Sequence, residues 1–199
     1  MLRSTFIVVS LFALSTASVF SLAPRKNLIK KAFESIKDKD FRTNNHGYLC
    51  EQLAIDSFKK KYPDPKYQIW NSIVYFNGGG IIGELDLVVY NSKSKKAEVV
   101  GEVKCKSRPY SALKKAHDQL DRFLSNKSGK SVRFVDACTK KVVNKKIFSG
   151  KSISDVTVSY NGTVKKGFTY ELELTFPEIK ILHKKVKCYK EPKRYPDCS

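Results

Sequence analysis

The chain has 199 residues, and its 38 lysines and arginines against 19 aspartates and glutamates give a formal net charge of +19. Hydrophobic residues at 41% and aromatic residues at 12% exclude a disordered chain, and only 10 glycines and 7 prolines exclude a collagen-like or low-complexity protein. So large a positive charge favours a polyanionic partner, nucleic acid first and an anionic membrane surface second. The oligomeric state stays open, with a dimer as one alternative.

The N-terminal segment is apolar. Residues 4–24 carry no charge, Arg3 precedes them, and small residues end the apolar run. This pattern is typical of a signal peptide, which we expect over residues 1–23, so the protein would be secreted or periplasmic. An uncleaved membrane anchor is the alternative, because the run is nearly long enough to span a bilayer. The basic residues that follow, Arg25 and Lys26 first, oppose translocation.

The chain contains five cysteines, none of them in a Cys-x-x-Cys motif or at a spacing that indicates zinc. Export permits disulfides, and Cys188 and Cys198 are predicted to pair because they close a short loop. An odd number leaves at least one thiol free or paired between chains. For Cys50, Cys105 and Cys138 the alternative is a role as small buried hydrophobic residues.

Helical spacing appears twice near the start. A basic amphipathic helix is predicted over residues 27–38, and a second helix over residues 44–62 with Asn44 or Asn45 as its cap. The second helix has an apolar stripe at helical spacing, made of Leu49, Leu53, Ala54 and Phe58.

Three runs rich in aromatic and β-branched residues follow, over residues 67–76, 81–90 and 97–106. Short turns separate them, so we expect an antiparallel meander. A helix is predicted over residues 110–124, and a strand over residues 131–138 is expected to extend the sheet.

The last third reads as strands. Residues 142–148, 156–160 and 169–176 are strand-like, and Asn161-Gly162 indicates a hairpin. We therefore expect four parts: the signal peptide, a basic N-terminal helix in residues 24–43, a core in residues 44–139, and a basic β-rich extension packed on the core in residues 140–199.

Two predicted strands carry charges among apolar neighbours: Asp86 on the second, Glu102 and Lys104 on the third. Buried charges are costly unless they pair or bind a metal. A tight meander brings Asp86 beside Glu102, where a divalent cation would relieve their repulsion, and oxygen ligands favour Mg²⁺ or Mn²⁺. Gly83 and Gly101 would let a backbone or ligand approach closely. The alternative is a cross-strand salt bridge of Lys104 on an exposed face.

An acid followed one strand later by Glu-x-Lys, between two helices, resembles the PD-(D/E)XK nuclease superfamily, and most closely its YraN-type, Holliday-junction-resolvase-like branch. The similar segments are residues 47–54, 83–87, 102–107 and 114–123. The resemblance implies an α/β (α+β) chain with a restriction-endonuclease-like αβββαβ core and a mixed sheet. The signal peptide and the basic C-terminal extension would be additions to that core.

The resemblance also implies site roles. Asp86 and Glu102 would bind the metal with the carbonyl of Val103, and Lys104 would be the catalytic lysine. Glu51 would be a further ligand or a supporting acid; its alternative is a surface helix glutamate. Gln119 would contact a phosphate or the attacking water; its alternative is a solvated helix residue.

The expected function is a metal-dependent nuclease that hydrolyses DNA, with RNA as a second substrate. Basic side chains would hold the phosphate backbone without reading sequence: Lys59, Lys60, Lys106, Arg108, Lys145, Lys146, Lys165 and Lys166. Two alternatives stay open, a non-catalytic nucleic-acid-binding protein with the same fold, and a secreted protein that binds an anionic surface or a host partner.

Overall fold

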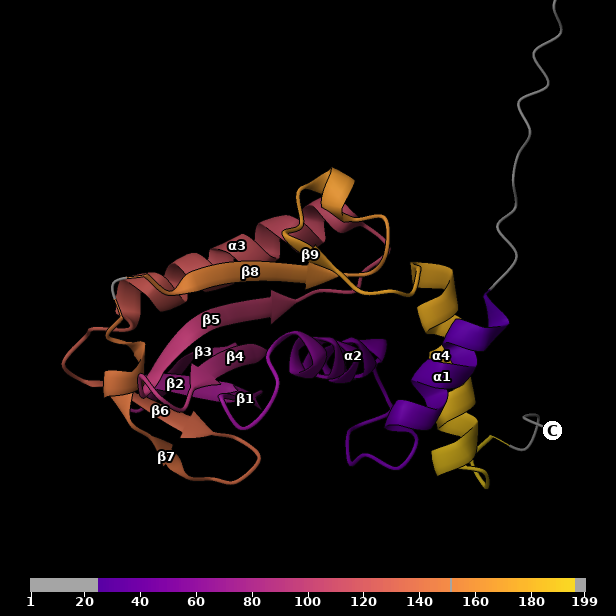
Figure 1. Ribbon diagram of the computed structural model, residues 1–199, viewed down its shortest axis with the longest axis horizontal. Helices are drawn as coiled ribbons and strands as arrows, with labels where there is room; N and C mark the ends of the chain where they lie inside the picture. The colour runs from indigo at the N-terminus through magenta and orange to yellow at the C-terminus, as the bar shows by residue number, and fades with distance from the viewer. Residues whose placement is uncertain (1–24, 151, 196–199) are drawn as a thin grey trace, which may run out of the picture.

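The computed structural model describes residues 25–150 and 152–195, and shows a mixed α+β protein with four helices and two sheets in these ranges (Figure 1). The expected signal peptide, residues 1–23, lies outside the described residues. Among the helices of the described part, none is long and apolar enough to cross a membrane.

Three of the four helices confirm the sequence prediction: α1 (Lys26–Ile36), α2 (His46–Lys61) and α3 (Pro109–Asn126). Asn45 caps α2, because its side chain accepts a hydrogen bond from the backbone N–H of Gly47 at 2.8 Å. Proline opens α3, where its missing N–H costs nothing.

The helix α4 (Phe176–Lys190) was not predicted. Residues 169–176 were expected to form a strand, but only β9 (Tyr170–Glu171) does so. Thr175 and Glu178 form a capping box at the start of α4, and this signal was overlooked in the alternating Leu-Glu-Leu-Thr-Phe run.

The main sheet has the order β1-β4-β5-β8-β9, in which β1, β4 and β5 are antiparallel neighbours and β8 runs parallel to β5. The second sheet has the order β3-β2-β6-β7. The strand bounds not yet given are β1 (Tyr67–Trp70), β2 (Ile73–Asn77), β3 (Gly80–Leu85), β4 (Leu87–Asn91), β5 (Lys96–Val103), β6 (Val132–Asp136), β7 (Val142–Val143) and β8 (Ser154–Ser159).

The predicted meander is present but bent. The first run divides into β1 and β2 near Ser72, whose φ of 52° is left-handed, and the second divides into β3 and β4 at Asp86. One half of this long hairpin therefore pairs in the main sheet and the other half in the second sheet. Asp86 thus lies at the bend rather than inside a continuous strand.

Three further expectations were wrong. The strand in residues 131–138, β6, pairs with β2 instead of extending the main sheet, and β8 takes the place beside β5. Residues 142–148 form only β7 and the 3₁₀-helix η1 (Lys145–Phe148). Asn161-Gly162 does not make a hairpin, because β8 and β9 are parallel and η2 (Val164–Lys166) lies between them. The chain beyond residue 140 is therefore less rich in strands than expected.

Helices α2 and α3 cover opposite faces of the main sheet. Leu87, Val89 and Val99 belong to the core cluster that contains α2, while Val88 and Val100 belong to the cluster that contains α3. This division follows from the two-residue period of a strand. Glu102 is two residues beyond Val100, so it shares the face that α3 covers.

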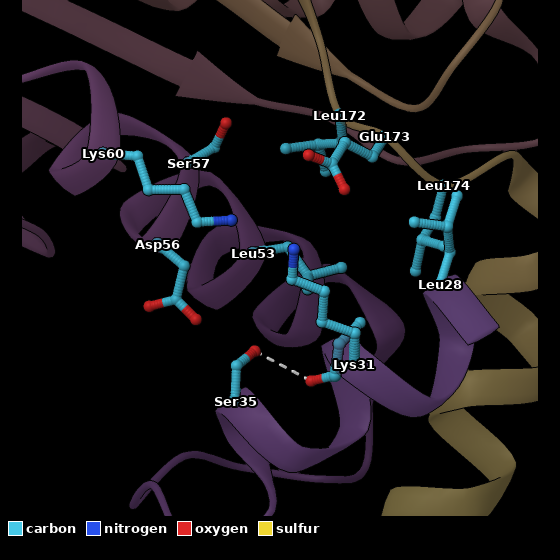
Figure 2. Close-up of a pocket in the computed structure, with 11 residues that line it drawn as sticks. Leu28, Lys31, Ser35, Leu53, Asp56, Ser57, Lys60, Leu172, Glu173 and Leu174 are labelled. Carbon is cyan, nitrogen blue, oxygen red and sulfur yellow. Dashed lines mark hydrogen bonds between the residues drawn. The ribbon is translucent and has the colours of Figure 1, made fainter.

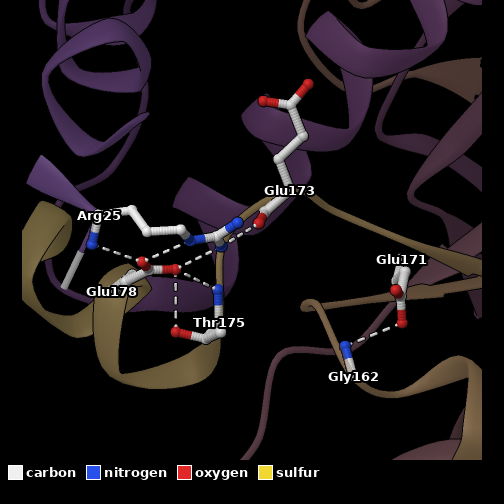
Figure 3. Close-up of polar contacts among 6 residues, drawn as sticks. All are labelled: Arg25, Gly162, Glu171, Glu173, Thr175 and Glu178. Carbon is white, nitrogen blue, oxygen red and sulfur yellow. Dashed lines mark hydrogen bonds and ion pairs between the residues drawn. The ribbon is translucent and has the colours of Figure 1, made fainter. Parts of the chain in front are cut away.

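An ion pair fastens the start of α1 to the start of α4 (Figure 3). The Glu178 carboxylate accepts hydrogen bonds from the backbone N–H and side chain of Arg25, at 2.8–3.0 Å, and from the backbone N–H and hydroxyl of Thr175. Mainly because of Arg25, the pKa of Glu178 falls to about 2. In the same view, Glu171 accepts from the Gly162 N–H and steadies the turn after β8.

Replacing Arg25 with alanine should lower the free energy of unfolding by roughly 1–3 kcal/mol at pH 7, because a buried carboxylate loses its charged donors. The pKa of Glu178 is lower in the folded protein than the value near 4.5 expected in the unfolded chain, so its charge stabilises the fold at pH values above 4.5. This contribution is lost as the pH falls toward about 2. Denaturant unfolding of Arg25→Ala and of wild type, measured from pH 7 to pH 2, should therefore give free energies of unfolding that converge as the pH approaches 2.

The matched control is Arg194→Ala, which removes an exposed arginine from its pair with Glu191. Such surface pairs contribute little, so its effect should stay below about 1 kcal/mol. Equal losses in the two variants would contradict the special role of Arg25.

Candidate active site

A single lysine joins the two carboxylates that the sequence singled out. The Lys104 Nζ lies 2.9 Å from Asp86 Oδ2 and 2.6 Å from Glu102 Oε2. Asp86 Oδ2 also accepts a hydrogen bond from the Val103 N–H at 2.8 Å. Glu102 is fully buried, and its second oxygen, Oε1, has no hydrogen-bond partner among the described residues. The predicted proximity of Asp86, Glu102 and Lys104 is therefore present.

The neighbouring strand β8 holds the backbone of this lysine. The Lys104 N–H donates to the Val158 carbonyl at 2.9 Å, and the Ser159 hydroxyl donates to the Lys104 carbonyl at 2.8 Å. Lys104 follows the last residue of β5, so the parallel pairing with β8 fixes where its side chain begins. The position of the charge thus depends on a strand far along the chain.

Burial and charge shift the pKa values of this cluster. Burial first, and then the charge of Asp86, raises the pKa of Glu102 to about 9. Burial lowers the pKa of Lys104, but attraction to Asp86 and Glu102 outweighs it, so the net shift is upward. The lysine therefore stays positive, and the buried glutamate binds a proton more readily than a surface one.

Glu51 approaches the cluster from α2. Burial, together with the charges of Asp86 and Glu84, raises its pKa to about 8, while Lys104 acts in the opposite direction. Glu51 is half-buried and lines the same cleft as Lys104, so it is not a fully exposed surface glutamate. A carboxyl group with a pKa near neutrality is suited to exchanging a proton.

A cleft of about 510 Å³ opens beside Lys104. Four parts of the chain line it: the start of α2, the end of β5 with the residues after it, α3 and the start of α4. The lining residues are Asn45, His46, Gly47, Glu51, Val103, Lys104, Cys105, Lys106, Ser107, Lys115, Phe176 and Lys180. Four of them are lysines and one is an acid, so the cleft favours an anion.

Gln119, on α3, is not among the residues that line this cleft. Its Oε1 is buried and has no hydrogen-bond partner in the described part of the chain. Its predicted contact with a phosphate or water stays a prediction.

Gly83 and Gly101 were expected to let a backbone or a ligand approach closely, but side chains of the protein core occupy the space beside them. A Cβ on Gly83 would lie 2.5 Å from the Tyr75 hydroxyl oxygen, and one on Gly101 would lie 2.8 Å from a methyl carbon of Val156. Both positions need glycine because the core packs tightly against them.

Only some of the predicted phosphate-binding residues lie near the cleft. Lys106 lines the cleft, Arg108 caps α3 nearby, and Lys166 lies over the Tyr110 ring at 5.3 Å, which places η2 with Lys165 near the start of α3. Lys59 and Lys60 lie on the last turn of α2, about 12 Å along the helix from Glu51.

Lys145 and Lys146 lie at the far end of β5. Lys96, the first residue of that strand, donates from its ammonium to the Lys146 carbonyl at 2.9 Å. A strand rises about 3.3 Å per residue, so Glu102 is about 20 Å away. These two lysines do not belong to the cleft.

Sequence reasoning missed His46, Lys115, Phe176 and Lys180 as lining residues. The last two lie on α4, which was not predicted: Phe176 was placed at the end of a strand, and Lys180 was given no element. The His46 Nε2–H donates a hydrogen bond to the Cys105 carbonyl at 2.7 Å, and its ring contacts that of Phe176.

Cys50 and Cys105 are both buried, as the alternative interpretation expected, but a disulfide joins them, so they are not simply small hydrophobic residues. Cys138 is the free, exposed cysteine of the described residues. The predicted pair of Cys188 with Cys198 involves Cys198, which lies outside the described residues. Cys50 precedes Glu51 and Cys105 follows Lys104, which is the sequence signal that could have revealed this crosslink.

Another pocket, of about 160 Å³, lies between α1, α2 and the segment that leads to α4 (Figure 2). Leucines from all three parts line it, namely Leu28, Leu53, Leu172 and Leu174. Asp56 at its edge is paired with Lys39. It contains none of the clustered acids described above.

No protein-family model, no curated protein and no solved structure matches this chain. The interpretation of the site therefore depends on its own geometry.

The Cys50–Cys105 crosslink spans a sequence separation of 55 residues. A double change to alanine should lower the free energy of unfolding by about 2–4 kcal/mol, because the unfolded chain regains the freedom of that loop. Chemical denaturation of the oxidised protein measures the loss, with Cys138→Ala as the control that should leave stability unchanged. A double variant as stable as wild type would show that the crosslink does not brace the site.

Proposed function

We propose that this protein is a metal-dependent nuclease with a PD-(D/E)XK-type site and a restriction-endonuclease-like core. The main support for the proposal is that Lys104 forms ion pairs with both Asp86 and Glu102 beside a cleft lined by lysines. The chain order α2, bent hairpin, β5, α3 and then a strand beside β5 supports the proposed core. In this arrangement β8, rather than the strand in residues 131–138, extends the main sheet beyond β5.

The residues present fit Mg²⁺ or Mn²⁺. Glu102 Oε1 is a buried acceptor with no partner, and a buried acceptor of this kind is satisfied by a cation. Asp86, Glu102 and the Val103 carbonyl would hold the ion, with Glu51 as a supporting acid beside it. The described residues contain no group of three or more His, Cys, Asp or Glu side chains placed to hold a metal. Magnesium is compatible with this, since it uses one or two carboxylates and keeps several waters.

When bound, such an ion supplies an activated water and shields the charge that develops on the phosphate. Lys104 would then turn from the carboxylates to the phosphate and stabilise that charge. Glu51, with a pKa near neutrality, would take the proton of the attacking water. The water oxygen bonds to phosphorus as the bond to the leaving sugar oxygen breaks, and the cleft lysines hold the backbone.

Phosphate contacts do not distinguish DNA from RNA, so the proposal includes both. DNA is the first expected substrate and RNA the second. Export through residues 1–23, with a membrane anchor as the alternative, is part of the proposal. The Cys50–Cys105 disulfide supports export, since disulfides persist in oxidising compartments.

The second candidate is a non-catalytic nucleic-acid-binding protein with the same fold. One observation favours it: the Lys104 ammonium already contacts both carboxyl groups, and with a pKa of about 9 the Glu102 carboxyl is protonated at neutral pH, so Lys104 and Asp86 balance each other without a metal. A secreted protein that binds an anionic surface is the third candidate, which the basic cleft also permits.

Substitutions in the cluster separate the first two candidates. Asp86→Ala and Glu102→Ala should abolish both cleavage and thermal stabilisation by Mg²⁺ or Mn²⁺, since each removes a ligand. Lys104→Ala should reduce cleavage by about 10² or more, the effect typical of losing one preorganised charge. It should be less stable than wild type without metal and more strongly stabilised by metal, because the two carboxylates then face each other unpaired.

Cleavage of plasmid DNA and of single-stranded DNA and RNA, with metal or with chelator, gives the rates, and melting gives the stabilisation. Lys114→Ala is the control, because its exposed ammonium pairs with Asp118 on the surface of α3 and, within the described residues, with no other acid. Cleavage that persists in Glu102→Ala and Lys104→Ala, with no effect of metal on melting, would remove the nuclease from this site.

The lysines of the cleft should govern substrate affinity. The double change Lys106→Ala with Lys180→Ala should raise KM and lower the slope of log affinity against log salt by about 1.4–1.8. Lys59→Ala with Lys60→Ala removes the same charge from the far end of α2 and should change KM less. A larger effect of the second pair would place the substrate path along α2 instead.

A further inference from the structure

A second groove, of about 840 Å³, lies away from the candidate active site. Parts of β1, β4, the start of β5 and the segment from β6 to η1 line it. Lys96 is in the groove and begins β5, six residues before Glu102, so this end of the groove is about 20 Å from the buried acid of the candidate site. Figure 1 shows β7 and α4 at opposite ends of the molecule.

The groove is strongly basic. Lys95, Lys96, Lys141 and Lys146 line it, against one acid, Asp136. Asp136 already accepts hydrogen bonds from the backbone N–H groups of residues 138 and 139. None of the four lysines forms an ion pair within the ranges that the structure describes. Their charge is therefore available to a polyanion.

An aromatic platform lies in the same groove. The Trp70 and Tyr90 rings stack with their centroids 4.7 Å apart and an interplanar angle of 16°. The pairing of β1 with β4 explains this, because Trp70 is opposite Val88 and Tyr90 is two residues further on the same face. Both rings are half-buried, so part of the pair is open to the groove.

We propose that this groove binds single-stranded nucleic acid, with the lysines on its phosphates and the Trp70–Tyr90 pair under its bases. Lysines along a groove beside a stacked aromatic pair are what sequence-independent binding of an unpaired strand requires. A duplex hides the faces of its bases, so only its phosphates could contact the groove. The proposal goes beyond the nuclease, because it needs neither the metal nor cleavage.

Trp70 is the one tryptophan of the chain, so its fluorescence reports on this groove alone. Titrating the purified protein with an oligothymidylate of about twelve nucleotides, in chelator, should quench that emission as a base stacks on the ring. Inorganic polyphosphate should quench it far less, because it has charge without bases. No quenching by the oligonucleotide, or equal quenching by polyphosphate, would overturn the proposal.

Variants test the two halves of the groove by anisotropy of a labelled oligothymidylate. Lys141→Ala with Lys146→Ala should weaken binding about tenfold at low salt and lower the salt slope by about 1.4. Tyr90→Leu, which keeps an apolar side chain against the core, should weaken binding about tenfold with the slope unchanged. Melting confirms that each variant is folded.

The charge-matched control is Lys26→Ala with Lys30→Ala, which removes two exposed lysines from α1 and should change this affinity less than about twofold. A control as damaging as the groove variants, or a duplex of the same length bound as tightly as the single strand, would overturn the proposal. Because all of these measurements are made in chelator, loss of cleavage does not affect them, and a failed nuclease assay leaves this test standing.

Discussion

The buried charge of Lys104 sets the main constraint on this structure. An ammonium group taken out of water is costly unless acidic groups surround it, and here Asp86 and Glu102 both lie within 3 Å of it. To bring them there, the long hairpin bends at Asp86, and β5 ends so that Lys104 turns back toward Glu102. The separation of the strands into two sheets begins at the same bend.

The rest of the molecule supports this cluster from several directions. The strand β8 fixes the backbone of Lys104, the Cys50–Cys105 disulfide ties α2 to the residue after it, and α2 brings Glu51 near. A cluster of partly neutralised charges held by separate elements is suited to chemistry, because the Glu51 and Glu102 carboxyl groups have raised pKa values and one oxygen of Glu102 is unsatisfied. The same cluster also satisfies itself through Lys104, which is why binding without catalysis is the second candidate.

Positive charge is distributed over the molecule in separate places. The lysines of the cleft surround the acids, while those of the Trp70 groove lie at the other end of β5. A net charge of +19 alone gives no information on this separation. A chain with two separate basic depressions can hold a polyanion at more than one point.

Local sequence determined the helices α1, α2 and α3, the three extended runs and the set of Asp86, Glu102 and Lys104, because caps, periodicity and charge among apolar neighbours act within a few residues. Only the tertiary structure decided the bend into two sheets, the placing of β8 rather than β6 beside β5, the Cys50–Cys105 pairing, and which lysines line the cleft. Strand partners, crosslinks and shared surfaces join residues far apart in the chain, and the gain from such contacts depends on the packing of the whole core rather than on any local pattern.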